Sequence, residues 1–205
     1  MSLPDVVSVT IDGSATASHP AELAVLRITT RAMAYNRTEA SVALHHLMAP
    51  IETAFEHLRT NVAGDAAAAI TRWNGSDVKT FSDHAETGLA VYTAVATSWA
   101  EFRNFDIMAR TVHDIRLMGC SSVDWVDWTL TAQKKTEVMH ELREKAVADA
   151  MDKAEAYRKV LGKKKMKKVE VSSDGEDEIY EKGEISYGPE NVCLQVRVKV
   201  RFEAS

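Results

Sequence analysis

The sequence contains few of the residues that mark specialised protein classes. It has two cysteines, Cys120 and Cys193, far apart and without CxxC or CxxxH spacing, which argues against a disulfide framework and a structural zinc site. Four prolines and nine glycines in 205 residues exclude a collagen-like chain and a proline-rich disordered one. No stretch reaches the ~18 to 20 apolar residues that a membrane-spanning helix needs, so we expect no membrane span.

Motifs of the common enzyme classes are also missing. The sequence contains no GxSxG elbow, no P-loop, no GxGxxG and no HExxH. Glu137 and His140 form a single ExxH pair, whereas a di-metal helix bundle needs two such pairs. His45, His46 and His57 have neither i, i+3 nor i, i+4 spacing. We therefore predict a protein that is not an enzyme and holds no metal or other cofactor.

One enzymatic alternative stays open, because a catalytic triad is recognised by its geometry and not by its order in the sequence. His84 or His113 with Asp83 or Asp114 would supply the imidazole and the carboxylate. The alternative prediction is a small-molecule carrier or hydrolase that uses a pocket between sheet and helices. Convergent polar groups near His84 or His113 would distinguish it.

The overall charge restricts the partners of the chain. The formal net charge is -5, with 25 Lys and Arg against 30 Asp and Glu, which disfavours a dedicated nucleic-acid binder. Contents of 45% hydrophobic and 27% charged residues are typical of a globular protein. The segment MSLPDVVSVTIDG has no basic region followed by an apolar core, so we expect no signal peptide and a cytoplasmic or nucleocytoplasmic location.

Hydrophobic periodicity predicts an α+β fold with a mostly antiparallel sheet. The first strand begins at Val7, and residues 21–34 are predicted to pair with it as a hairpin, because His19 precedes a proline and avoids the helical region. The predicted order is β-β-α-β-β-α-β-α-β-β, with two longer helices and one shorter helix packed on the sheet. The helices are expected over 36–60, 104–119 and 134–162, and the remaining strands over 66–82 (broken at NGSD), 88–102, 121–132, 166–173 and 191–203.

We predict one domain over 1–205, because the sequence contains neither an internal repeat nor a low-complexity linker. Between the last two strands, the stretch SSDGEDEIYEKGEISYGPE is acidic and contains glycine. It predicts an exposed acidic loop over 172–190.

The segment AVADAMDKAEAYRKVLG, residues 146–162, predicts a helix that packs closely on a flat layer. Small side chains in the middle of its apolar stripe allow the helix axis to approach a sheet, and Gly162 supplies a left-handed C-terminal cap. The stripe consists of Val138, Leu142, Ala146, Ala150, Ala154, Tyr157 and Leu161. The expected ion pairs are Glu141 with Lys145, Asp149 with Lys153 and Glu155 with Lys159. We interpret the helix as scaffold.

This helix, preceded by VDWVDWTLT and followed by KKVEVSS, resembles the A-x-x-D-A-x-x-K-A-x-x-x-A-x-x-x-G region of the SIMPL-domain family. The segment VSVTIDGSATASHPAELAVLRITTRA is similar to that family's G-x-G-x-x-x-x-x-P-D-x-A segment, with Glu22 at the usual aspartate and Ser14 just after Gly13. The resemblance covers essentially the whole chain.

The resemblance implies an α+β domain of bacterial envelope and oxidative-stress proteins and of a eukaryotic adaptor that binds a receptor-associated kinase. It implies no established catalytic residues, and some members self-assemble. The missing secretion signal and the acidic 172–190 segment favour an intracellular relative. We predict a homo-oligomer or a protein that binds a protein partner, with signalling or stress response as its setting.

Two groups of residues are candidates for an interface. Trp125 and Trp128 point to opposite faces of one predicted strand. Trp128 is predicted to be core, whereas Trp125, with Val123 and Asp127, is either covered by another part of the fold or exposed as an interface anchor. The segment KKKMKK, with Lys163, Lys164 and Lys165, either contacts an anionic surface or is a solvated helix exit that faces the acidic loop.

Overall fold

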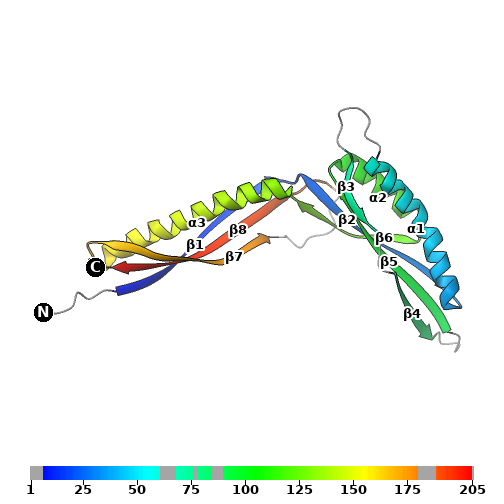
Figure 1. Ribbon diagram of the computed structural model, residues 1–205, viewed down its shortest axis with the longest axis horizontal. Helices are drawn as coiled ribbons and strands as arrows, with labels where there is room; N and C mark the ends of the chain where they lie inside the picture. The colour runs from blue at the N-terminus through cyan, green and yellow to red at the C-terminus, as the bar shows by residue number, and fades with distance from the viewer. Residues whose placement is uncertain (1–6, 61–67, 76–77, 85–89, 180–187, 205) are drawn as a thin grey trace. The chain divides into compact units, whose positions relative to one another are not determined.

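The computed structural model describes residues 7–60, 68–75, 78–84, 90–179 and 188–204 (Figure 1). Contacts within the chain divide it into two compact units. The first unit comprises Met1–Pro20, Leu130–Lys182 and Asn191–Ser205, and the second comprises Ala21–Thr129 and Gly183–Glu190. We describe each unit by itself, and the single-domain organisation stays a prediction.

The first unit is a three-stranded antiparallel sheet with a long helix, α3, lying along it (Figure 1). The strand order is β1-β8-β7. Residues of β8 alternate between buried and exposed, as the sequence predicts, and its apolar side chains pack beneath α3. The elements are β1 (Val7–Pro20), α3 (Ala132–Val160), β7 (Met166–Ile179) and β8 (Asn191–Ala204).

Helix α3 approaches β1 very closely, as the alanine stripe predicts. A Cβ atom added to Gly13 of β1 would lie 2.0 Å from the carbonyl oxygen of Ala146 and 2.9 Å from Cβ of Ala150. Ala146, Ala150 and Ala154 are all buried. A hydrogen at Gly13 and methyl groups on the helix therefore set the distance between helix and sheet.

The carboxyl end of the stripe is wrongly predicted. Tyr157 and Leu161 are 53% and 45% exposed, so the buried part of the stripe ends at Ala154. Glu155 also differs from the prediction, since it pairs with Arg158 at 2.6 Å and not with Lys159. Arginine binds both carboxylate oxygens of Glu155, which a lysine does not do.

The second unit is a five-stranded antiparallel sheet with two helices (Figure 1). The strand order is β3-β5-β2-β6, and β4 also pairs with β5. The elements are β2 (Leu23–Ala34), α1 (Arg37–Thr60), β3 (Ile70–Asn74), β4 (Val78–His84), β5 (Ala90–Phe102), α2 (Phe105–Leu117) and β6 (Ser121–Thr129). The α+β class and the element order are confirmed, with β3 and β4 as the two halves of the strand broken at NGSD. The strands form two sheets.

The predicted opening hairpin is wrong. β1 pairs with β8, and β2 pairs with β5 and β6. Residues 19 and 20 continue β1 to its pairing with residues 192 and 191. A residue before proline avoids the helical region, but it can be in a turn or in an extended strand. His19 is in an extended strand here, so β1 continues through Pro20 and does not reverse.

The predicted acidic loop over 172–190 is wrong for residues 172–179. β7 continues to Ile179 in pairing with β8, and residues 180–187 lie outside the described residues. The acidic side chains that suggested a loop have cationic partners on β8 and α3, which permits a charged strand. These pairs are Asp174–Lys199 at 2.6 Å, Glu176–Arg143 at 2.6 Å and Glu178–Lys135 at 2.8 Å. The bond from Arg143 lowers the pKa of Glu176.

Both helices of the second unit pack on the same face of its sheet. Small residues of β2 and β5, among them Ala32 and Ala94, contact Leu44 of α1 in one buried cluster. At the start of α2, Phe105 meets the ring of Trp128 edge-on at 4.9 Å, and Trp128 is buried as predicted. The opposite face of the sheet carries no helix from the described residues of this unit.

Candidate functional site

The helix-free face of the five-stranded sheet, here called the open face, has a hollow of about 700 Å³. Every strand of the sheet contributes side chains to it. The lining residues are Val25 and Arg27 of β2, Arg72 and Asn74 of β3 with Gly75, Lys79 and Phe81 of β4, Val95, Thr97 and Trp99 of β5, and Trp125 and Asp127 of β6.

Strand register aligns aromatic and cationic side chains across the open face. Arg27 pairs with Trp125 of β6 on one side and with Trp99 of β5 on the other. Its guanidinium carbon lies 4.1 Å from the centroid of the Trp125 ring. That of Arg72 lies 5.5 Å from the centroid of Trp99. Each tryptophan therefore has a guanidinium within cation–π distance.

Polar neighbours lie beside the exposed Trp125 and the half-buried Arg27. The indole Nε1 of Trp125 donates to Asp127 Oδ2 at 2.9 Å. Arg27 Nε lies 3.9 Å from Asp124 Oδ2, and the same oxygen accepts a 2.6 Å hydrogen bond from Thr29. The indole of Trp125 is thus oriented by a hydrogen bond without a ligand, whereas Nε of Arg27 has no hydrogen-bond partner among the described residues.

A carboxylate at the margin of the open face is almost completely buried. The side chain of Glu101 is 8% exposed, and Oε2 accepts from Arg72 at 3.0 and 2.8 Å. The hydroxyl of Thr71 donates to the other oxygen. Thr71 and Arg72, which are adjacent in β3, both reach the carboxylate of Glu101 because the register of β3 shifts between Ile70 and Arg72.

A second register shift removes one member from the group Val123, Trp125 and Asp127 that the sequence predicted on one face of β6. Arg27 pairs with Trp125 and Ile28 pairs with Val123, so Asp124 is an extra residue in β6. Ile28 is buried on the helix-covered face, and Val123 therefore lies on that face and not beside Trp125 and Asp127. Trp125 is 41% exposed, which decides between the two alternatives in favour of exposure.

The other predicted interface residues belong to the first unit. Lys163, Lys164 and Lys165 follow α3 and precede β7. They are a separate feature from Trp125 and Asp127, and the interface role of all these residues stays a prediction.

Sequence reasoning missed Arg27, Arg72, Lys79, Phe81 and Trp99. In β5, alanines such as Ala94 and Ala96 alternate with Val95 and Trp99. The alternation of small and bulky residues could have distinguished the two faces of β5. The small residues lie under α1, and the bulky ones lie on the open face. Hydrophobicity alone treats both faces as apolar, whereas close helix packing requires the small ones.

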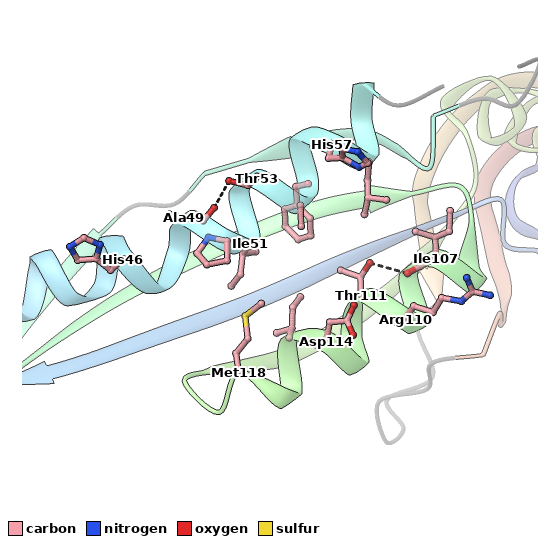
Figure 2. Close-up of a pocket in the computed structure, with 15 residues that line it drawn as sticks. His46, Ala49, Ile51, Thr53, His57, Ile107, Arg110, Thr111, Asp114 and Met118 are labelled. Carbon is pink, nitrogen blue, oxygen red and sulfur yellow. Dashed lines mark hydrogen bonds between the residues drawn. The ribbon is translucent and has the colours of Figure 1, made fainter. Parts of the chain in front are cut away.

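A second hollow of about 980 Å³ lies between α1 and α2 on the covered side (Figure 2). Its floor is apolar, with Ile51 and Phe55 among the lining residues. The hydroxyls of Thr53 and Thr111 donate to the carbonyls of Ala49 and Ile107, as the dashed lines in Figure 2 mark. These hydroxyls are therefore already satisfied within their own helices.

The catalytic alternative is not assembled in this hollow. Asp114 and His57 line it, whereas His113 is exposed and does not. The side chains of Asp83 and His84 lie outside the described residues. In the ExxH pair, His140 lies 3.7 Å from Glu144, and Glu137 accepts from Gln133 at 3.0 Å.

Two kinds of feature are absent from the described part of the chain. No group of three or more His, Cys, Asp or Glu side chains there is arranged to hold a metal ion. No helix there is long and apolar enough to cross a membrane.

Comparison with protein families gives a match over nearly the whole chain. The SIMPL family model, described as a protein of unknown function (DUF541), matches residues 9–202. The chain belongs to the SIMPL family. The resemblance seen in the opening segment and in the alanine-rich helix is therefore confirmed over nearly the whole chain. No curated protein matches this SIMPL chain.

The structure gives the shared SIMPL segments a physical role. Gly13 comes from the amino-terminal segment, and Ala146 and Ala150 come from the alanine-rich helix. They form a close contact between α3 and β1. These segments therefore build the helix-on-sheet core of the first unit, and the open face belongs to the second.

Proposed function

We propose that this SIMPL protein is a non-catalytic binding protein whose open face contacts a protein partner, a second copy of the chain included. The observation that carries the proposal is Trp125, which is 41% exposed and has Arg27 stacked 4.1 Å from its ring. Tryptophan and arginine supply much of the binding energy at the centres of protein interfaces. Phe81, 56% exposed at the same hollow, adds apolar area.

Preorganisation of the open face supports the proposal. Binding orders flexible side chains at a cost of about 0.5 to 1.5 kcal/mol each. Asp127 holds the indole of Trp125 before a partner arrives, which lowers this cost for the tryptophan. An intracellular location and a part in signalling or stress responses remain predictions from the sequence.

The test compares W125A with Y35A, which removes another exposed aromatic ring, 75% exposed in the same unit. Light scattering measures the mass of each protein in solution, and quantitative capture from cells measures retained partners. We expect W125A to lose a dimer or a retained partner that the parent and Y35A keep. If neither the mass nor any captured protein depends on Trp125, the proposal is wrong.

A second candidate function, carriage of a small apolar molecule, is favoured by the hollow between α1 and α2. Its volume of about 980 Å³ is at the upper end for small-molecule pockets. Ala54 of α1 lines it and is exposed, so A54W fills it with an indole ring. Binding of a fluorescent apolar probe that A54W abolishes and W125A preserves supports this candidate, and equal probe binding by parent and A54W contradicts it.

A further inference from the structure

The end of α3 presents apolar side chains that the fold leaves uncovered. Tyr157, Val160 and Leu161 are 53%, 84% and 45% exposed. Val160 and Leu161 follow Tyr157 by three and four residues, so the three side chains share one side of the last helical turns. Exposed apolar groups gathered in this way mark an interaction surface.

Lysines surround this apolar group. Residues 159–168 contain six lysines in ten positions. Lys164, Lys165, Lys167 and Lys168 are exposed, and none of the four forms an ion pair with another described residue. We call residues 157–168 the basic tip.

The acidic part of β7 does not neutralise the basic tip. The sequence left open that these lysines face the acidic segment, but Asp174, Glu176 and Glu178 pair with Lys199, Arg143 and Lys135. Glu155 is taken by Arg158, and Glu170 by Arg201 at 3.3 Å. Glu203 is a further acidic residue beside the tip, as the register partner of Lys167.

The basic tip has a fixed backbone. Gly162 takes the left-handed conformation, with φ of 65°, that ends α3. Nη1 of Arg158 donates to the carbonyl of Lys163 at 3.0 Å, and the N–H of Lys163 donates back to the carbonyl of Arg158 at 3.2 Å. The turn that carries the lysines is therefore held against the end of the helix.

We propose that the basic tip docks on the surface of a membrane that contains anionic lipid. Apolar side chains beside lysines match the boundary between headgroups and acyl chains, where both find partners. The unpaired lysines complement the negative lipid charge, and each raises binding roughly fivefold. A phosphate backbone or an acidic peptide would satisfy the lysines but would leave Val160 and Leu161 in water.

The test is co-sedimentation of the full chain with vesicles of phosphatidylcholine alone and with vesicles in which one third of the lipid is phosphatidylserine. We expect binding to the anionic vesicles that added salt weakens. K164Q/K165Q/K167Q/K168Q should reduce this binding roughly 600-fold, and V160S/L161S roughly tenfold. The control R31Q/R37Q/R103Q/R110Q removes as many charges from exposed positions of the second unit and should bind like the parent.

Circular dichroism establishes that each variant is folded, and the two-site variant K164Q/K165Q replaces the fourfold variant if that one does not fold. Equal binding to neutral and anionic vesicles, no binding to either, or full binding by the folded lysine variants overturns the proposal. W125A should bind vesicles like the parent, so the outcome is separate from that of the open-face proposal.

Discussion

The carboxylate of Asp149 on α3 accepts a 2.9 Å hydrogen bond from the backbone N–H of Ser14 on β1. Lys153 donates both to Asp149, at 2.7 Å, and to the carbonyl of Asp12, at 3.0 Å. β1 is an edge strand, so these backbone groups have no strand on their outer side. The helix therefore closes, at these two residues, an edge that would otherwise be open to another strand.

The close approach at Gly13 predicts a large cost for a single methyl group. G13A places a Cβ atom 2.0 Å from the carbonyl oxygen of Ala146, so the helix must move away. We expect a loss of about 3 kcal/mol or more in the free energy of unfolding, measured by urea denaturation. G188A is the control, since a Cβ there meets no atom within 4 Å. Equal stability of both variants would contradict the observed packing.

Asp149 predicts a pH-dependent contribution to stability. The bond from Lys153, and after it the bond from Ser14, lower the pKa of Asp149 in the folded state. The stabilisation is therefore fully present above the unfolded pKa of about 3.9, and it is lost as pH falls through the lower folded pKa. We expect D149N to be less stable than the parent near neutral pH, with a difference that shrinks below about pH 4.

The measurement for Asp149 is urea unfolding of parent and D149N from neutral to acidic pH. D152N is the matched control, because Asp152 lies on the same helix, is exposed and forms no bond with a described residue. A parent-to-D149N difference that does not change with pH would show that the charge of Asp149 does not act as described.

Arg72 predicts a different kind of loss, because its removal leaves a buried charge. R72A leaves Glu101, whose side chain is 8% exposed, with Thr71 as its remaining side-chain partner. We expect a cost of about 2 kcal/mol. The double variant R72A/E101Q should recover much of this cost, since no buried carboxylate remains. A double variant less stable than R72A, measured in the same unfolding assay, would contradict the argument.

The two tryptophans of β6 predict opposite responses to truncation. Trp128 is 6% exposed and contacts Phe105, so W128A should cost about 3 to 5 kcal/mol. Trp125 is 41% exposed, so W125A should cost less than about 1 kcal/mol. Thermal unfolding of the two variants measures the difference. A strongly destabilised W125A would contradict this prediction, because it would show that Trp125 stabilises the fold.

Local patterns in the sequence determined the individual elements. Period-two alternation predicted β8 and its buried face. The alanine spacing of residues 146–154 predicted a helix that lies close on a sheet, and Gly13 explains how close. Such patterns succeed because neighbours along one strand or helix fix which side chains share a face.

Pairing between distant strands was decided by the tertiary structure alone. The hairpin prediction was wrong because His19 is compatible with both a turn and an extended strand, and the partner of β1 lies far away in the sequence, in β8, where even the nearest pair joins Pro20 to Asn191. The acidic segment became strand β7 because its charges meet Arg143, Lys199 and Lys135, which no local pattern reveals.

The open face depends on register in the same way. The sequence by itself selected Trp125 and Asp127, because alternation within one strand places them together. Arg27 and Trp99 joined them through pairing with other strands, and one extra residue at Asp124 moved Val123 to the opposite face. Local periodicity is a property of a single segment, whereas register is set by the packing of several segments at once, so only the folded chain determined the composition of the site.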